Sequence, residues 1–283
     1  MPFYMSPEQT MRDKADYARK GVARSRSSVA LQYSGGILLV TPNVSSVLHK
    51  ISEIYDRIAF AAVGRYNEYE ALRKAGVTYA DITGYQFDRG DVTARGLANW
   101  YAQTLGGNFS EAAGKPYEVE IVVAEVGAKP DSDQIYRISW DGSVSDEPGF
   151  VAFGGQVDQV AAALKEGFAD GLSLTEALGV ALAALSAPPT ATPGAQPQAA
   201  NGNAQPELTE ANLEVAILDR ARAHRTFRRL HGPRLAELIA ESRAASAAAE
   251  PADTASTDSD AEPAPPSDEP PIGPSSAGDG IPR

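Results

Sequence analysis

The chain has 283 residues, of which 43% are hydrophobic, and a formal net charge of −12. It contains no cysteine, which excludes disulfides, thiolate metal ligands and a cysteine nucleophile, and only three histidines, so we expect neither a metal site nor a cofactor. No stretch approaches the roughly 20 consecutive apolar residues of a membrane-spanning helix. We therefore expect a cytoplasmic protein with no membrane partner.

Much of the negative charge lies at the C-terminal end, where residues 250–283 hold eight acidic residues and one basic residue. The segment is rich in Pro, Ser, Ala and Asp and offers little to bury, which predicts a disordered acidic tail over 246–283. Residues 187–206 have no apolar periodicity and predict a linker-like insertion. The folded domain is therefore expected over residues 7–245.

The first stretch that can fold is a helix that runs from Pro7 to about Lys20. Ser6 is a good N-cap, and Pro7 stands at the first helical position, where its missing N–H costs nothing. An apolar residue recurs at helical spacing at Met11, Ala15, Ala18 and Val22. Gly21 predicts the C-cap. Because this stripe is thin and the other faces are charged, we expect the helix to lie across the outside of the fold.

Blocks of strands then alternate with pairs of helices. Strands are predicted at 29–33, 37–41, near 51, and at 58–64, 117–126, 134–140, 150–154, 212–219 and 225–230. Helices are predicted at 66–75, 91–105, 157–168, 174–185 and 233–245. Paired helices between blocks of strands favour an α+β fold, a four-layer αββα sandwich of two stacked, mainly antiparallel sheets with the N-terminal helix added.

Short motifs along this order resemble those of one protein family. They are Ser6-Pro7, Tyr17-Ala18-Arg19, the hairpin over 29–41, Leu48-His49-Lys50-Ile51 and Gly64. Together, over roughly residues 4–245, they resemble the α-type subunits of proteasome core particles, in particular the actinobacterial branch. The resemblance implies the sandwich of the N-terminal-nucleophile hydrolases, a seven-membered ring of these chains, and stacking on rings of β-type subunits. It also implies that the opening helix, with Tyr17 and Arg19, packs against neighbours in the ring.

The resemblance includes catalytic relatives, so the position of their nucleophile in this chain decides whether it is expected to be catalytic. Proteases of this fold attack with the hydroxyl of the first residue, whose free α-amine takes the proton. Ser27 and Ser28 occupy the corresponding place, but 26 residues precede Ser27, and Val40-Thr41-Pro42 lacks the expected acidic residue. We therefore predict a non-catalytic subunit. The alternative is a self-processed threonine/serine-type hydrolase whose chain begins at Ser27 or Ser28.

Lys50 is the predicted docking residue. In related α subunits a lysine just before an isoleucine lies in the groove between subunits and receives the C-terminal carboxylate of a ring-shaped AAA ATPase activator. A carboxylate withdrawn from water needs a cation, so the chemistry is coherent. Met11 and Ser25 match further positions of that pocket, with Ser25 where archaeal relatives carry glycine.

The first six residues make a short, apolar and uncharged segment, and we predict that this segment forms a gate. Seven such segments that converge on an axis would close a pore by hydrophobic contact. The predicted gate comprises Pro2, Phe3, Tyr4, Met5 and Ser6, with Pro7 at its hinge; the alternative is a frayed terminus. The family implies ATP-dependent degradation of unfolded proteins, which in actinobacteria are tagged with a small protein modifier.

A basic stretch over 220–234 offers a function of another class. It contains Arg220, Arg222, His224, Arg225, Arg228, Arg229 and Arg234, with Phe227 among them. Clustered arginines and an aromatic residue are typical of nucleic-acid-binding surfaces. The rest of the folded part is acidic and has no helix-turn-helix or RNA-binding signature, so we expect no nucleic-acid partner.

Overall fold

A computed structural model describes residues 6–111, 114–187 and 207–249. The described residues belong to one compact unit that ends at Ala249. The predicted gate residues Pro2, Phe3, Tyr4 and Met5 lie outside the described residues, as do almost all of the linker and the acidic tail beyond 249. No helix among the described residues is long and apolar enough to cross a membrane.

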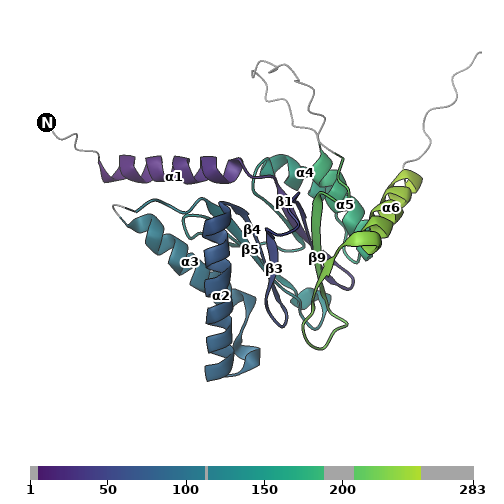
Figure 1. Cartoon of the computed structure of the whole chain (residues 1–283), viewed down its shortest axis with the longest axis horizontal. Helices are drawn as coiled ribbons and strands as arrows, with labels where there is room; N and C mark the ends of the chain where they lie inside the picture. The colour runs from purple at the N-terminus through teal and green to yellow at the C-terminus, as the bar shows by residue number, and fades with distance from the viewer. Residues whose placement is uncertain (1–5, 112–113, 188–206, 250–283) are drawn as a thin grey trace, which may run out of the picture. The chain divides into compact units, whose positions relative to one another are not determined.

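Two antiparallel five-stranded sheets are stacked at the centre (Figure 1). Sheet A has the order β10-β9-β2-β1-β8, with β1 (Ser28–Tyr33), β2 (Gly36–Pro42), β8 (Phe150–Phe153), β9 (Leu213–Asp219) and β10 (Phe227–Leu230). Sheet B has the order β3-β4-β5-β6-β7, with β3 (Ile51–Tyr55), β4 (Ile58–Gly64), β5 (Val119–Glu125), β6 (Gln134–Ile138) and β7 (Val144–Asp146). Every residue of β2 is buried, as its unbroken apolar run predicts for a strand covered on both faces.

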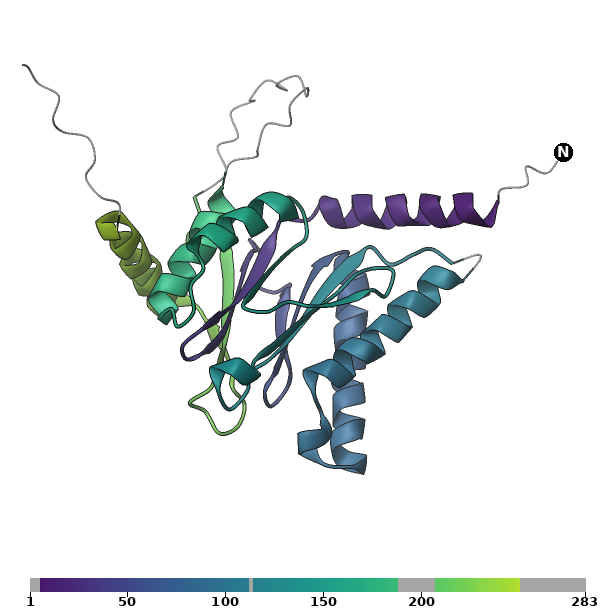
Figure 2. The same ribbon diagram turned by 180° about the vertical axis from the view of Figure 1, so that it is seen from behind.

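Helices cover both outer faces, as Figures 1 and 2 show from opposite sides. The first pair, α2 (Tyr66–Gln86) and α3 (Ala94–Ser110), packs on sheet B. The second group, α4 (Val157–Gly167), α5 (Leu174–Ser186) and α6 (Gly232–Ala249), packs on sheet A. Short 3-10 turns lie at Arg89–Asp91 and Pro130–Ser132. A third apolar layer fills the space between the sheets, so the predicted αββα order is confirmed.

Helix α2 is longer than its predicted end at residue 75. Gly76 lies inside the helix rather than beyond it, because α3 approaches closely there: a Cβ added at Gly76 would overlap the hydroxyl of Tyr101. That hydroxyl donates to the carbonyl of Leu72, at 3.2 Å. The glycine therefore permits helix contact and does not terminate the helix.

The opening helix α1 (Pro7–Ala23) begins as predicted, since the Ser6 hydroxyl accepts from the backbone N–H of Gln9 at 3.2 Å. The predicted C-cap at Gly21 is wrong, because the helix continues to Ala23 with Arg24 as its C-cap. A Cβ at Gly21 would overlap the side chain of Glu118, which is buried just before β5. Gly21 therefore allows α1 to lie close to sheet B, at the end where α1 contacts β4 and β5.

The apolar stripe of α1 is only partly as predicted. Ala18 and Val22 are buried, but Met11 is 40% exposed and Lys14 is buried instead. The ammonium of Lys14 donates to the carbonyls of Phe109, at 3.4 Å, and Glu111. These carbonyls end α3, where a cation satisfies free acceptors and complements the helix dipole. Lys14 thus joins α1 to α3, although the apolar pattern of α1 does not predict a buried residue at this position.

Candidate functional site

The two serines at the nucleophile position are engaged within the fold. Ser28 begins β1, is 2% exposed, and shares a hydrogen bond of 2.6 Å between its hydroxyl and that of Thr41 on β2. Ser27 donates its hydroxyl to the carbonyl of Gly155. Its own nitrogen is a peptide nitrogen in the chain that leaves α1, so it cannot serve as the free amine that this catalysis requires.

The chain that leaves α1 is held over this position by Gly154 and Gly155. The N–H of Gly155 donates to the carbonyl of Ser25 at 3.1 Å, and a Cβ there would overlap the carbonyls of Ser25 and Ala23. Gly154 has φ +102°, and its N–H donates to the buried carboxylate of Glu120 at 2.8 Å. The absence of side chains at these two glycines therefore lets the segment that follows α1 pack directly against their backbone.

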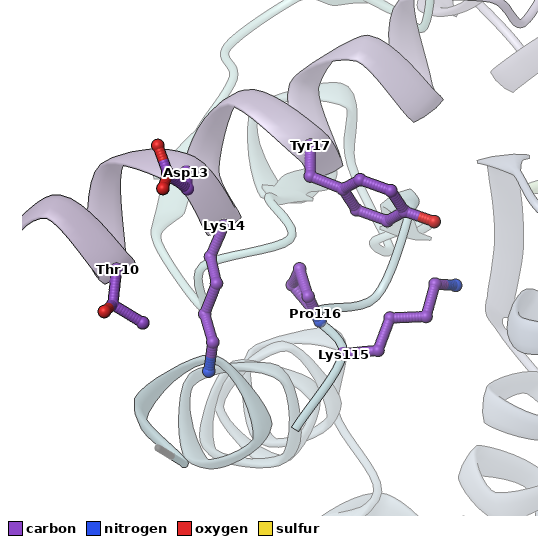
Figure 3. Close-up of a pocket in the computed structure, with 6 residues that line it drawn as sticks. All are labelled: Thr10, Asp13, Lys14, Tyr17, Lys115 and Pro116. Atoms are coloured by element: carbon purple, nitrogen blue, oxygen red, sulfur yellow. The ribbon is translucent and has the colours of Figure 1, made fainter. Parts of the chain in front are cut away.

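The underside of α1 forms a small groove of about 280 Å³ (Figure 3). It is lined by Thr10, Asp13, Lys14, Tyr17, Lys115 and Pro116. The Lys115 ammonium lies 5.7 Å from the centroid of the Tyr17 ring and 2.9 Å from the carboxylate of Glu118. Burial raises the pKa of Glu118, but Lys115, Tyr17 and the charge of Arg65 together outweigh burial and hold the pKa below its usual value. Tyr17 nevertheless stays 48% exposed.

Arg19 lies on the outer surface of α1. Its guanidinium pairs with Asp16 at 3.1 Å, and both side chains are more than half exposed. Tyr17 and Arg19, the two predicted ring-contact residues, are thus both accessible on α1.

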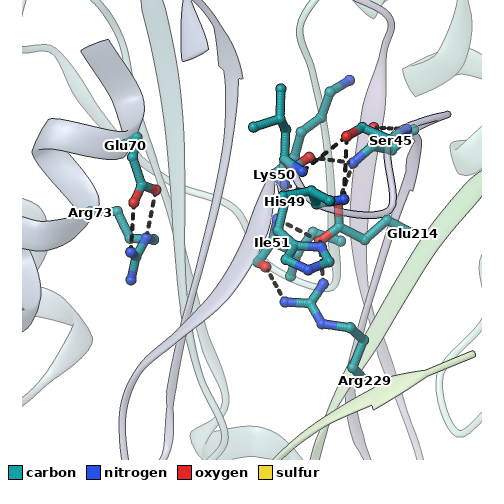
Figure 4. A network of polar contacts seen from close by, with 11 residues as sticks. Ser45, His49, Lys50, Ile51, Glu70, Arg73, Glu214 and Arg229 are labelled. Carbon is teal, nitrogen blue, oxygen red and sulfur yellow. Dashed lines mark hydrogen bonds and ion pairs between the residues drawn. The ribbon is translucent and has the colours of Figure 1, made fainter. Parts of the chain in front are cut away.

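The loop between β2 and β3 brings Lys50 to the surface in a defined turn (Figure 4). The side chain of Asn43 closes the loop by accepting from the N–H of Ser45 at 3.0 Å and donating to the carbonyl of Leu48 at 2.8 Å. The Ser45 hydroxyl accepts from the N–H of Leu48 at 2.9 Å. Lys50 follows this turn and directly precedes β3, so its position depends on how the end of the loop is fixed.

Glu214 of β9 fixes the end of the loop, although no sequence motif marks this residue. Its buried carboxylate accepts from the backbone N–H groups of Lys50, at 2.9 Å, and Ile51, at 3.1 Å. It also accepts from the amide of Asn43 at 2.8 Å and pairs with the guanidinium of Arg229. Arg229 in turn donates to the carbonyl of Ile51 at 2.8 Å. A charged residue in the buried strand Leu213–Asp219 was the available signal, because such a charge must be paired.

The ammonium of Lys50 has a different environment from its backbone. It donates to the carbonyl of Pro42 at 3.1 Å, and among the described residues no carboxylate lies within ion-pair distance of it. Burial lowers the pKa of Lys50, Glu214 opposes this shift, and Arg26 adds to it. Lys50 is therefore a half-buried cation that is hydrogen-bonded to a neutral acceptor.

The three predicted pocket residues do not lie together within one chain. Met11 is near the start of α1 and Ser25 follows its end, so they are separated by roughly 20 Å of helix axis. Ser25 is next to Arg26, whose charge reaches Lys50. Met11 is therefore remote from Ser25 within one chain, whereas the residue after Ser25 acts electrostatically on Lys50.

The basic stretch over 220–234 is neutralised by ion pairs, which argues against a nucleic-acid surface. Five of its six arginines pair with carboxylates: Arg220 with Asp133, Arg225 with Glu53, Arg228 with Asp219, Arg229 with Glu214, and Arg234 with Glu237. Phe227 packs against the apolar layer between the sheets and is therefore not free to stack on a base. Two of these pairs, Arg220 with Asp133 and Arg225 with Glu53, link the stretch to sheet B or to the segment just before β6.

Comparison with known proteins agrees with this geometry. The sequence model of the family described as "Proteasome subunit" matches residues 22–188. A protein of Thermomonospora curvata named proteasome subunit alpha is 62% identical over 241 residues, which cover 85% of this chain and 98% of that protein. Proteins of the same name from Kineococcus radiotolerans and Streptosporangium roseum are 60% and 62% identical, over 84% and 87% of this chain and 98% and 90% of their own lengths. The chain therefore belongs to the proteasome subunit family, as a non-catalytic alpha subunit that assembles with other proteasome subunits.

Proposed function

We propose that this chain forms the outer, gated ring of a proteasome core particle and that Lys50 docks the C-terminal carboxylate of a ring-shaped AAA ATPase. The ammonium of Lys50 carries the proposal, since it is half-buried, is bonded to the neutral carbonyl of Pro42, and has a pKa lowered chiefly by burial. An entering carboxylate would supply the missing counter-charge through a charge-assisted hydrogen bond.

The ring that we propose has seven members, with one docking pocket between each pair of neighbours. Because Met11 and Ser25 stand at opposite ends of α1, the pocket would combine Lys50 and Ser25 of one chain with Met11 of the next. The exposure of Met11, Tyr17 and Arg19 on α1 supports a contact made along this helix. This ring would then template the rings of β-type subunits.

Residues 1–6 would form the gate at the axis of the ring, with Pro7 at the hinge. Ser6 and Pro7 begin α1 through a side-chain cap, so a segment that precedes them would leave the helix from a fixed point. We further propose that the particle acts in the cytoplasm on unfolded proteins tagged with a small protein modifier. These substrates would pass the gate once the activator is docked.

The test uses the particle assembled with its β-type partner and follows hydrolysis of a fluorogenic peptide. A short synthetic peptide with a free C-terminal carboxylate, copied from the C-terminus of the activator, should stimulate hydrolysis, and its amidated form should not. Lys50→Ala should abolish the stimulation, whereas Lys74→Ala, which removes an exposed lysine on α2, should leave it unchanged. Full stimulation of the Lys50→Ala particle would disprove the docking role.

The gate is tested separately by deletion of residues 2–6. The shortened particle should hydrolyse the peptide faster than the full-length particle in the absence of any activator. An unchanged basal rate would show that these residues do not close the pore, and would leave the docking role of Lys50 to stand on its own test.

A further inference from the structure

We propose that Glu214 is the positioning residue for Lys50: from sheet A, it fixes the backbone of the lysine that docks the activator. The inference rests on the proposed docking role of Lys50. It adds a buried carboxylate on β9 to a site otherwise made of surface residues.

The backbone geometry is the first argument. One carboxylate oxygen of Glu214 accepts from the N–H of Lys50 and the other from the N–H of Ile51, so the carboxylate holds two successive peptide units at once. Glu214 belongs to sheet A and Ile51 begins a strand of sheet B. The bond pair therefore sets where Lys50 stands relative to both sheets, and Arg229 holds the carboxylate and the Ile51 carbonyl in place.

The side chain of Lys50 is held by the same part of sheet A as its backbone. Its ammonium donates to the carbonyl of Pro42, which stands opposite Leu213 in the pairing of β2 with β9, next to Glu214. Both ends of the lysine thus depend on one short stretch of sheet A. A binding group held at its backbone and at its tip loses little freedom when a ligand arrives, which favours affinity.

The charges around Lys50 also favour a role for Glu214. The charged groups that face Lys50 are Glu214 from β9, which raises its pKa, and Arg26 from the segment after α1, which lowers it. Arg229 from β10 contacts Glu214, and His49 lies 3.4 Å from the same carboxylate. Burial also lowers the pKa of Lys50, so Glu214 is the group that opposes loss of the proton. Without its charge, Lys50 would release its proton at a lower pH.

The experiment measures the peptide concentration that gives half-maximal stimulation of the assembled particle, as a function of pH. In the wild type, affinity should fall as pH rises through the pKa of Lys50, because the protonated lysine binds the carboxylate. In Glu214→Gln the half-maximal concentration should rise about tenfold with unchanged maximal stimulation. Its loss of affinity should begin at a lower pH than in the wild type.

Asp133→Asn is the matched control. Asp133 is a buried carboxylate that pairs with Arg220 beyond the other end of β9, so its loss weakens the fold without touching Lys50. This variant should keep both the half-maximal concentration and the pH profile of the wild type. An equal change in both variants would mean that Glu214 acts only through stability, and would overturn the inference.

Arg229→Gln keeps the test decisive if Glu214→Gln does not assemble. It removes a cation that shares the Glu214 carboxylate, so the pH at which affinity is lost should move upward, opposite to the Glu214→Gln shift. A pH profile identical to the wild type in these variants would refute the positioning role. Normal stimulation of Lys50→Ala would instead refute the docking role itself, so the two failures can be told apart.

Discussion

Buried ion pairs lie at both ends of β9, and the two ends differ in whether their positive and negative charges balance. At the first end, Glu214 and Arg229 have side chains that are 6% and 26% exposed. Just beyond the other end, Arg220 and Asp133 have side chains that are 14% and 0% exposed. Arg220 links the end of sheet A to Asp133, just before β6 of sheet B, and Glu214 links sheet A to Ile51 of sheet B, so topology does not distinguish the two ends.

Charge balance does distinguish them. The Arg220 guanidinium binds both oxygens of Asp133, at 2.7 and 2.8 Å, and also donates to the carbonyl of Gly127, so one positive charge faces one negative charge. Around Glu214, one carboxylate serves Arg229, lies near His49, and supports the charge of Lys50. The balanced end maintains the sandwich, whereas the end with surplus positive charge is suited to an anionic ligand. The surplus of charge, not burial, identifies the candidate site.

The largest expected effect is at the balanced end. Asp133→Ala leaves Arg220 charged and buried without its partner, which should lower the free energy of unfolding by about 3–5 kcal/mol. Urea denaturation followed by tryptophan fluorescence, at fixed protein concentration, measures this change. A loss below about 1 kcal/mol would place this pair with the exposed ones and remove the contrast.

Glu214→Ala should cost less, about 2–3 kcal/mol, although it removes more hydrogen bonds. Arg229 is more exposed than Arg220 and can regain water, and the two freed N–H groups lie at the edge of a loop. The same denaturation experiment measures the cost. A larger loss than in Asp133→Ala would reverse the order of the two ends.

Lys50→Met should not destabilise the chain at neutral pH, and is expected to change stability by 0 to about 1 kcal/mol in the favourable direction. The pKa of Lys50 in the fold is lowered from 10.5, so the unfolded chain binds more protons between the two values. The stability of the wild type should therefore gain from this group as pH rises through that window. Denaturation at several pH values should show the advantage of Lys50→Met shrinking toward high pH; a constant difference would contradict it.

The layered fold could be predicted because its signals are local. Unbroken apolar runs such as Ile37–Val40 need cover on both faces, and Ser6-Pro7 specifies a helix start without reference to the rest of the chain. Gly21 and Gly76 were misleading for the opposite reason. Each resembles a helix end locally, but serves a close contact, with Glu118 or Tyr101, that only the packed structure reveals.

The candidate site could be predicted only in part. Lys50 was identified from a motif, but its positioning residue is 164 positions away along the chain, and no spacing rule links them. Likewise, Lys14 interrupts an apolar stripe because its partners are carbonyls at the end of another helix. Long-range polar pairing is decided by tertiary structure, so sequence could indicate at most that a charge in a buried strand needs a partner.

The smallest expected change in stability is for an exposed ion pair at the balanced end of β9. It tests whether burial or location decides how much an ion pair contributes there. Arg228 pairs with Asp219 at 3.3 Å, next to Arg220 in the same corner of the fold, but its side chain is 51% exposed. Arg228→Ala should therefore change the free energy of unfolding by only about 0.2–1 kcal/mol, and less at high salt. Denaturation at two salt concentrations measures both features. Because Arg228 and Arg220 share this corner of the fold, a loss as large as that of Asp133→Ala would show that location alone, rather than withdrawal from water, makes a pair important there.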